Sequence, residues 1–415
     1  MGARERYRVI RRKTSKAKYN WFAELAVGGS GLARHLLERK GRRLCDINTI
    51  SSSAVATFQL ASSSPQTRIP PAFGIACPAS DISTHSPINA YLLNDVITSA
   101  KTSLISANEK LLVPKEFINQ REILVIEPGA VGYFNPRYAI RYIQTYHQYE
   151  NAILIGGNGS SNWYHYLIEV APKAFLASLL PEKFNDFPLI VPKPAQSAGP
   201  FSDILQSLLP GRPILNFSND SIHVRNLIVF DEVSHGPFNL DSGLWPKTPD
   251  YSQHENVLRA VFEKMRTSLL PVGGQLTQTR RFFIVRPDTR RSYNQTELLK
   301  IAQKFSFEPI SPETLSLREQ ALLFAEASHV VGASGAAWTN MVFAPLPFKA
   351  LTWVIPQYHQ FCSYSMLAHL LGHQLHYLVA EPNKKIRSTH DAFSASYFVS
   401  PIEFEAALTR LTEEN

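Results

Sequence analysis

A chain of 415 residues with 44% hydrophobic side chains is long enough for two or three domains, at about 150 residues each. This composition excludes a disordered polymer, and no run reaches the ~20 uninterrupted apolar residues of a membrane-spanning helix. Three widely separated cysteines, Cys45, Cys77 and Cys362, exclude a disulfide framework and a zinc knuckle. With no apolar signal-peptide core at the N-terminus, we expect a cytoplasmic protein.

The net charge of +8 is concentrated at the N-terminus, where residues 1–18 hold eight basic side chains and the single acid Glu5. We interpret residues 1–50 as a basic tail, either a solvated disordered segment or one that contacts anionic lipid headgroups. Each basic residue near such a surface can add about 1 kcal/mol. No finger, helix-turn-helix or aromatic-basic RNA motif accompanies the charge, so we expect no nucleic-acid partner.

The sequence of the first half predicts a Ser- and Pro-rich loop with one strand inside it, followed by alternating strands and helices. Ile and Leu runs bounded by Gly and Pro indicate buried strands, and an apolar helix contains Pro172, where we expect a kink. The predicted elements are loop 51–74, strands 121–129 and 151–157, helix 163–181, strand 188–193, helix 201–210, strand 224–231 and helix 254–271.

The second half repeats the alternation after a loop at 271–280. Its predicted elements are strand 281–287, helix 295–305, strand 307–312, helix 317–327, strand 329–334, a helix from about Ala337, strand 350–356 and helix 362–372. Such alternation is typical of parallel sheets covered on both faces. We predict an α/β fold with two doubly wound domains, 51–272 and 273–380, facing across a cleft, and a segment 381–415 that packs back on the first domain.

The stretch at residues 329–345 carries an apolar strand into Gly332 and a run of small residues. If a helix follows at once, its first amides have no partner inside the helix and form a seat for an anion. The same stretch nearly matches the G-x-S-x-G elbow of hydrolases, with Ala336 in place of the last Gly. A serine hydrolase would then use Ser334, with Glu381 and His390 as the downstream candidates.

Other motifs are absent or weak. No G-x-x-x-x-G-K-[ST] and no complete G-x-G-x-x-G occurs, so a P-loop kinase and a dehydrogenase are not expected. His369, His373 and His376 have a spacing that permits metal binding on a helix, but Gly372 interrupts it and no carboxylate completes the set. We interpret these histidines as surface or helix-end residues.

Two groups of polar residues suggest chemistry. Arg286 leaves the end of a predicted strand and Arg290 and Arg291 follow in the next loop, a position where guanidinium groups bind phosphate bidentately. A solvated loop explains Arg290 equally well. His165 and Glu169 are four residues apart on a predicted helix, so either can accept a hydroxyl proton, unless they are only a hydrogen-bonded surface pair.

Four segments in order, residues 162–175, 282–299, 307–345 and 364–378, resemble glycosyltransferase family 61, whose bacterial members are often described as capsular polysaccharide biosynthesis proteins. The resemblance implies a GT-B fold of two Rossmann-like domains. It also implies a nucleotide-sugar donor on the second domain, a saccharide acceptor on the first, and transfer with inversion at the anomeric carbon.

The resemblance assigns roles residue by residue. His165 and Glu169 become the base candidates, and the choice between them stays open. The acceptor-side residues are Asn162, Tyr166 and Lys173. The donor-side residues are Arg286 and Arg291 for the diphosphate, Ser334, Gly335 and Ala336 for its developing charge, Glu319 for the ribose, and Asn294 and Asn340. The sequence departs from the family pattern at Ser334, where His is frequent, at Trp338, where Leu is usual, and at Gln295, where Glu is usual.

Because arginines and helix amides would neutralise the diphosphate, we expect no metal and no cofactor beyond the nucleotide-sugar co-substrate. A non-catalytic saccharide- or nucleotide-binding protein on the same fold remains the alternative, ahead of the serine hydrolase. The relatives that lack an anchor are bacterial and cytoplasmic. We therefore expect this protein on the inner side of the membrane, with its basic N-terminus a candidate for contact with anionic lipid.

Overall fold

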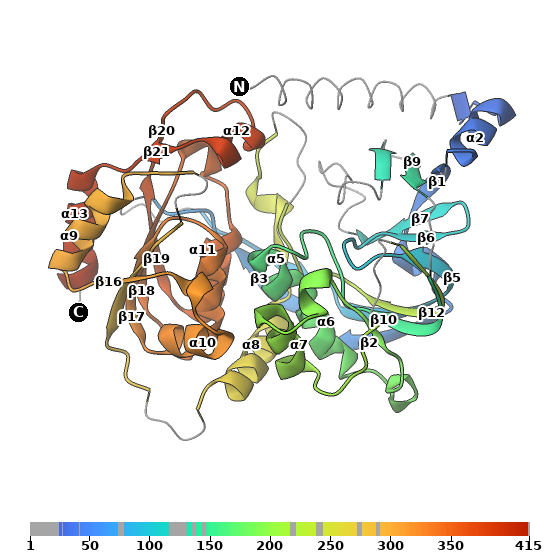
Figure 1. The fold of residues 1–415 in the computed structure, drawn as a ribbon, viewed down its shortest axis with the longest axis horizontal. Coiled ribbons are helices and arrows are strands. Elements are labelled where there is room, and N and C mark those ends of the chain that lie inside the picture. The colour runs from blue at the N-terminus through green and yellow to red at the C-terminus, as the bar shows by residue number, and fades with distance from the viewer. Residues whose placement is uncertain are drawn as a thin grey trace.

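The computed structural model contains two main β-sheets with helices between and around them (Figure 1). The residues that the structure describes are 25–26, 28–40, 42–73, 79–115, 131–134, 138–142, 147–215, 221–237, 244–271, 276–287 and 291–413. The predictions made for residues 1–18, for the strand at 121–129 and for Arg290 lie outside them.

The first sheet is mixed and has ten strands in the order β11-β10-β12-β5-β6-β7-β1-β9-β8, with β2 paired to β5. The strands are β1 Arg42–Thr49, β2 Ala56–Ala61, β5 Ile88–Thr98, β6 Ile105–Ala107, β7 Lys110–Val113, β8 Val131–Phe134, β9 Tyr138–Tyr142, β10 His147–Leu154, β11 Leu189–Ile190 and β12 Ile222–Phe230. β10 runs parallel to β11 and β12, whereas β5 runs antiparallel to β12, β2 and β6. The parallel sheet expected for residues 51–272 is therefore corrected to a mixed one.

Residues 42–113 contribute much of this sheet, although the sequence predicted only a loop with one strand at 51–74 and no element in the rest of this range. In β2 the side chains of Thr57 and Gln59 are exposed and their neighbours partly buried, so the strand shows no apolar run. Strands β3 (Ser64–Arg68) and β4 (Asp81–His85) form a separate antiparallel hairpin. Because β1 begins at Arg42, the predicted tail of 50 residues is also too long.

After β3 the chain crosses to the second half of the molecule. The carbonyl of Ala72 accepts a hydrogen bond of 3.1 Å from the Tyr377 amide, and Phe73 bridges to Tyr377 in parallel. The Ser365 hydroxyl donates to the carbonyl of Ile69. A segment from the first half thus covers the outer strand of the second sheet and satisfies part of its open edge.

The second sheet is parallel throughout, in the order β16-β15-β17-β18-β19. Its elements are β15 Arg280–Ile284, α9 Gln295–Lys304, β16 Glu308–Ile310, α10 Leu317–Ala325, β17 Ala327–Gly332, η7 Ala336–Phe343, β18 Lys349–Val354, α11 Ser363–Leu371 and β19 Gln374–Val379. Successive residues point to opposite faces: Phe283 and Val331 join the core under α9, and Phe282 and Val330 the core under α10 and α11. This sheet is therefore covered on both faces.

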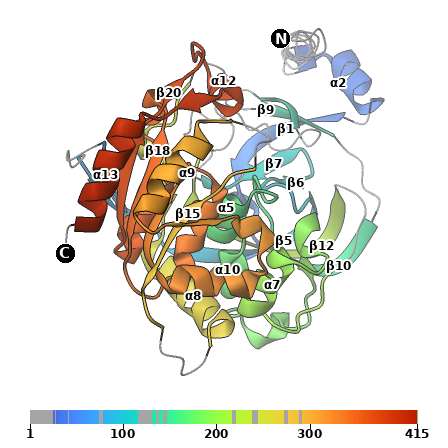
Figure 2. The same ribbon diagram turned by 60° about the vertical axis from the view of Figure 1, so that its left-hand side comes forward.

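The C-terminal helix α13 (Pro401–Glu413) corrects our placement of residues 381–415 on the first domain. It packs against α9 and β18 (Figure 2). Its buried Phe404 contacts Phe283 and Trp353 of the second sheet, and Leu408 belongs to the same hydrophobic cluster. Helix α13 thus covers the same face of the second sheet as α9. Two short strands, β20 (Glu381–Pro382) and β21 (Tyr397–Phe398), flank α12 (Thr389–Ser394) before it.

The helix predicted at 163–181 is broken into α5 (Trp163–His165), a π-helical turn η2 (Tyr166–Val170) and α6 (Pro172–Ala177). The Ala171 amide donates to the carbonyl of Tyr166, a spacing of five residues, and Pro172 supplies no amide to continue the ladder. The predicted kink is therefore a π-bulge, and it carries Glu169.

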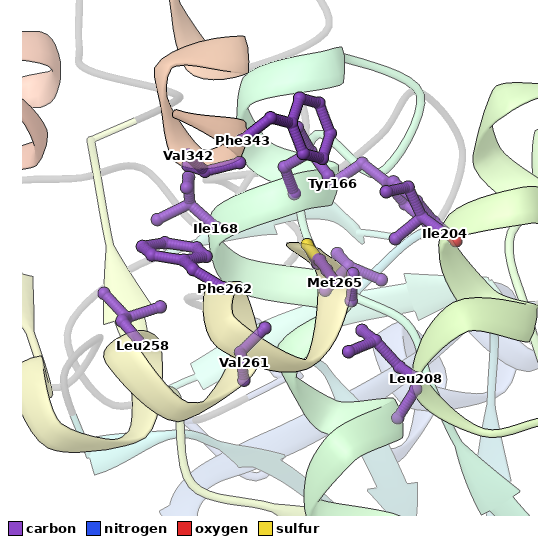
Figure 3. Close-up of a cluster of buried hydrophobic side chains, with 14 of the residues drawn as sticks. Tyr166, Ile168, Ile204, Leu208, Leu258, Val261, Phe262, Met265, Val342 and Phe343 are labelled. Carbon is purple, nitrogen blue, oxygen red and sulfur yellow. The ribbon is translucent and has the colours of Figure 1, made fainter. Parts of the chain in front are cut away.

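One hydrophobic core continues from the first half into the second. Tyr166 and Ile168 of η2 lie with Phe262 of α8 (Glu255–Leu269) against Val342 and Phe343 of η7 (Figure 3). All five side chains are at most 2% exposed. Helix α7 (Pro200–Leu208) closes the cluster with Ile204 and Leu208. The two halves are therefore held together by buried apolar area.

The hairpin β3–β4 docks on α8 through two buried histidines, which makes the fold sensitive to acid. The rings of His85 and His254 are 5.2 Å apart, and burial lowers the pKa of His85 to about 4, helped by the nearby cations His254, Lys115 and Arg68. A folded-state pKa below the unfolded value of about 6.5 means that stability is complete above pH 6.5 and is lost as the pH falls towards 4.

We expect His85 alone to cost up to about 3 kcal/mol of unfolding free energy between pH 6.5 and 4. Urea denaturation at stepped pH values measures this slope, and His85→Asn should make it shallower while keeping the bond to the Ser86 carbonyl. His373, whose pKa burial also lowers to about 4, accounts for part of the remaining slope. Identical slopes for the wild type and the variant would contradict the assignment to His85.

Candidate active site

His165, the last residue of α5, and Glu169 of the π-bulge η2 form a hydrogen-bonded dyad. His165 Nδ1 is 2.8 Å from Glu169 Oε2, and the two side chains are 12% and 8% exposed. A carboxylate only accepts, so the proton of the neutral imidazole lies on Nδ1 and its lone pair on Nε2. In this tautomer the imidazole can take a proton and the carboxylate holds its ring in place.

The second oxygen of Glu169 is also occupied. Oε1 accepts a hydrogen bond of 2.8 Å from the Gly236 amide, next to strand β13 (Ser234–His235). A Cβ at Gly236 would lie 3.3 Å from this oxygen and 3.6 Å from the Tyr164 ring, so the position favours glycine. Glu169 is thus fixed through both oxygens, and the orientation of His165 follows from it.

A second polar group lies where β15 and β17 end. The two strands are parallel with Ile284 opposite Gly332, so the residues that follow them meet at the same sheet edge. The guanidinium of Arg286 donates through Nη2 to the Ser334 carbonyl and through Nη1 to the Tyr397 hydroxyl. A Cβ on Gly335 would come within 2.7 Å of Nη2.

Arg291 brings a second positive charge to the same place. Burial lowers its pKa, and repulsion from Arg286 lowers it further, whereas Tyr397 opposes the shift. Arg286 makes no ion pair with any carboxylate among the described residues. A bound anion would offset the electrostatic repulsion between these two partly buried guanidinium groups. Arg291 also has φ of +53°, the left-handed region that costs a non-glycine residue about 1 kcal/mol.

Gln295 explains one departure from the family pattern. Its Oε1 accepts from the Arg286 amide at 2.8 Å and from the Tyr293 hydroxyl at 2.8 Å, while its Nε2 donates to the Arg286 carbonyl at 3.0 Å. An ionised glutamate could not donate the last bond. The amide therefore clamps the backbone of Arg286 on both sides and fixes where its side chain starts.

Two tyrosines link the dyad to the arginines. The rings of Tyr164 on α5 and Tyr364 on α11 meet edge to face at 5.6 Å. Burial raises the pKa of Tyr164, and the charge of Glu169 adds to the rise. Burial raises the pKa of Tyr364 to about 12, although Arg291 and Arg286 partly offset it. Glu169 is therefore an electrostatic neighbour of Tyr164, the two arginines are neighbours of Tyr364, and the two rings are in contact.

The three predicted acceptor-side residues have structural roles. Asn162 caps α5, where its Oδ1 accepts from the Tyr164 amide at 2.9 Å. Tyr166 is fully buried and donates to the Phe201 carbonyl, and Lys173 is buried in an ion pair of 3.0 Å with Glu232. Burial removes Tyr166 and Lys173 from any acceptor, so we do not retain that prediction for them.

Two predicted donor-side residues likewise serve the fold. Exposed Glu319 closes a capping box at the start of α10, and its hydrogen bonds from Ser316 lower its pKa. Asn294 holds the C-terminal segment by accepting from the Val399 amide and donating to its carbonyl. The ribose role proposed for Glu319 therefore has a simpler explanation as helix capping.

Asn340 connects the two halves. Its Oδ1 accepts from Trp163 Nε1 of α5 at 2.7 Å, and its Nδ2 donates to Gln320 Oε1 of α10 at 2.8 Å. The side chain is 1% exposed. The sequence placed Asn340 among the donor-side residues; the structure gives it a bridge across the shared core.

The small-residue run has more than one cause. Gly332 is required because a Cβ there would lie 2.8 Å from the Cβ of Ile284, a strand contact and not a ligand contact. The helix expected from Ala337 is the 3-10 helix η7, which begins at Ala336. Trp338 is fully buried and donates to the Ala333 carbonyl at 3.1 Å, which fits the larger side chain at that position.

The metal hypothesis for the three histidines gains no support. His373 is buried, with Nδ1 accepting from the Phe348 amide and Nε2 next to the Met341 carbonyl. Within the described ranges, no three His, Cys, Asp or Glu side chains gather closely enough to hold a metal ion.

Comparison with known proteins identifies a family over part of this chain. Residues 163–350 match the family model described as Glycosyltransferase 61. The match covers somewhat less than half of the 415 residues, from α5 to β18, and contains both the dyad and the arginine pair. It supports the resemblance to this family and a glycosyltransferase activity. No curated protein matches the chain, and none of the described helices has the length and apolar character needed to cross a bilayer.

Asn340→Ala should lower the free energy of unfolding by about 3 kcal/mol, because it leaves Gln320 and Trp163 without their buried partner. Asn94→Ala is the matched control, since it removes an exposed amide pair with Asn226 and should change stability by no more than about 0.5 kcal/mol. Urea denaturation of both variants measures the difference. Equal, small losses would show that the Asn340 bridge does not hold the halves together.

Proposed function

We propose that this protein is an inverting glycosyltransferase that moves a sugar from a nucleotide-sugar donor to a saccharide hydroxyl. The observation that carries the proposal is the contact between Tyr164, which neighbours the His165–Glu169 dyad, and Tyr364, which neighbours the cationic pair Arg286 and Arg291. We infer from this contact that the two groups serve one site. A transfer with inversion needs both an anion seat for the leaving group and a base for the acceptor.

In this proposal His165 is the base and Glu169 positions it. The sequence left the choice open, but both Glu169 oxygens already accept hydrogen bonds, from His165 and from Gly236. A carboxylate engaged in this way is better suited to holding the imidazole and stabilising its protonated form than to taking a proton itself.

The bond changes then balance as follows. The acceptor oxygen forms a bond to the anomeric carbon on the face opposite the diphosphate, and its proton passes to His165. The bond between the anomeric carbon and the diphosphate oxygen breaks, and its electron pair leaves on that oxygen. Arg286 and Arg291 receive the added negative charge, and donors held in place before the reaction can each contribute ~3 kcal/mol.

Gly335 has a defined part in this arrangement, because only a residue without a Cβ lets the Arg286 guanidinium lie against the start of η7. Ser334 contributes its carbonyl to that guanidinium, and Ala336 begins η7 beside it. Since two guanidinium groups carry the countercharge, we propose that the transfer needs no divalent cation. EDTA should then leave the rate unchanged, and loss of activity restored by manganese would contradict this.

We further propose that the nucleotide-sugar donor lies over the second sheet, with the acceptor on the side of α5. The two halves would then form a GT-B type pair. The biological setting that we propose is surface or capsular polysaccharide synthesis on the cytoplasmic side of the membrane, from the resemblance to bacterial members of the family.

Replacing the base should separate turnover from binding. We expect His165→Ala to lower kcat about 10²–10⁴-fold while leaving donor affinity unchanged, because the histidine acts on the acceptor proton. Glu169→Gln should lower kcat at least about tenfold, since an amide cannot accept from both His165 and Gly236. His223→Ala, a histidine near Asp95 on the first sheet, is the control and should keep full activity.

Initial rates over a panel of nucleotide sugars give kcat, and calorimetric titration with the corresponding nucleoside diphosphate gives the donor affinity. If His165→Ala and Glu169→Gln both retain near-normal kcat, the base lies elsewhere. If diphosphates bind to the wild type but no sugar is transferred to any acceptor tested, the non-catalytic binding protein is the better description.

A separate experiment tests whether Arg286 and its neighbour Gly335 form the binding site for the diphosphate. Gly335→Ala should push the Arg286 guanidinium aside without unfolding the protein, because the group it meets is the end of a flexible side chain. We expect the affinity for a nucleoside diphosphate, and for inorganic pyrophosphate as its common fragment, to fall about tenfold. Arg286→Ala should do the same.

Gly31→Ala is the matched control, since a Cβ there meets nothing within 4 Å. Unchanged diphosphate affinity in Arg286→Ala would remove the arginine pair from the donor site. Weaker binding in Gly31→Ala would show that the loss in Gly335→Ala is not specific.

A further inference from the structure

Helix α2 (Gly31–Glu38) lies at the edge of the molecule beside β1, far from the second sheet (Figures 1 and 2). Ser30 caps it by accepting from the Ala33 amide at 3.3 Å. The helix packs on β1 through Ala33 and Leu37, which are each 3% exposed. These two residues account for its attachment to the fold.

The same helix shows a second apolar face to solvent. Leu32 is 71% exposed and Leu36 is 37% exposed. Residues four apart share one side of a helix, and Arg39, three residues further on, continues that side. A single exposed leucine is ordinary on a protein surface. Here two exposed leucines share one helix face beside the buried Ala33 and Leu37, so the apolar surface of α2 is larger than the part that packs on β1.

Positive charge surrounds these leucines. Arg34, Arg39 and Lys40 are exposed, and Glu38 is the single acid of the helix. The sequence that precedes the helix adds eight basic side chains in residues 1–18, with Glu5 as their only acid. An apolar helix face bordered by arginine and lysine is the pattern of helices that lie in a membrane interface, and the charge selects anionic headgroups.

We propose that α2 docks the protein on an anionic lipid bilayer, with Leu32 and Leu36 entering the boundary between headgroups and acyl chains. Arg39 and Lys40 lie at the level of the lipid phosphates. Two leucines give weak binding alone, so attachment needs the basic charge as a second signal and weakens with salt. This docking is independent of the transferase chemistry, since α2 contributes nothing to the dyad or the arginine pair.

Co-sedimentation of the full-length protein with vesicles tests the proposal. We expect binding to vesicles of phosphatidylcholine with about a third phosphatidylglycerol, weaker binding at high salt, and little binding to phosphatidylcholine alone. The double variant Leu32→Ser with Leu36→Ser should partition about tenfold less strongly, because it removes the inserted side chains and keeps every charge.

The matched control is the double variant Leu179→Ser with Ile402→Ser, whose side chains are 47% and 82% exposed elsewhere on the molecule. It should bind like the wild type, and equal melting temperatures show that both variants are folded. Equal loss in the two variants would reduce the binding to general surface hydrophobicity and overturn the proposal.

Two further outcomes would also overturn it. Unchanged binding of the α2 variant would mean that the basic segment acts without the helix. Release of the protein from vesicles by a single-stranded RNA of mixed sequence, in amounts equal to the lipid phosphate, would identify the basic surface as one for nucleic acid.

Discussion

The relative position of the two halves of this protein depends on one hydrophobic core to which both contribute side chains. The π-bulge that carries Glu169, the helix α8 and the 3-10 helix η7 exclude water from one another, and Asn340 supplies the polar bridge within that layer. Because η7 begins directly after Gly335, the contact that positions the first half also positions the loop that receives Arg286. Glu169 and the residues at the start of η7 are thus both attached to this packed layer.

Three uncharged residues position the charged side chains of the candidate site. Gly335 and Gly236 each make room for one charged group, Arg286 and Glu169, and Gln295 holds the backbone from which Arg286 extends. None of these three carries a charge. Charged groups in partly buried places are costly unless the surroundings are arranged in advance, and here glycines and an amide provide that arrangement.

The sequence predicted the second half well, because its strands are buried on both faces and appear as apolar runs between helices of ordinary length. In the first half it predicted β10, β12, α7 and α8 but missed most strands of residues 42–113, since strands such as β2 alternate with exposed Thr57 and Gln59 and pair with distant segments. At the site, His165, Glu169, Arg286 and Arg291 came from spacing and family pattern. Tyr364 and Gly236 could not, because their role arises only when separate segments meet.

The strand-like crossing at Ala72 and Phe73 has a practical consequence. It ties residues from the start of the first half to the outer edge of the second sheet, while the C-terminal helix completes that same sheet. The halves are therefore not modules that can be separated by cutting the chain near residue 272. A fragment starting there would present a bare strand edge and an uncovered apolar face, and it would tend to self-associate during expression.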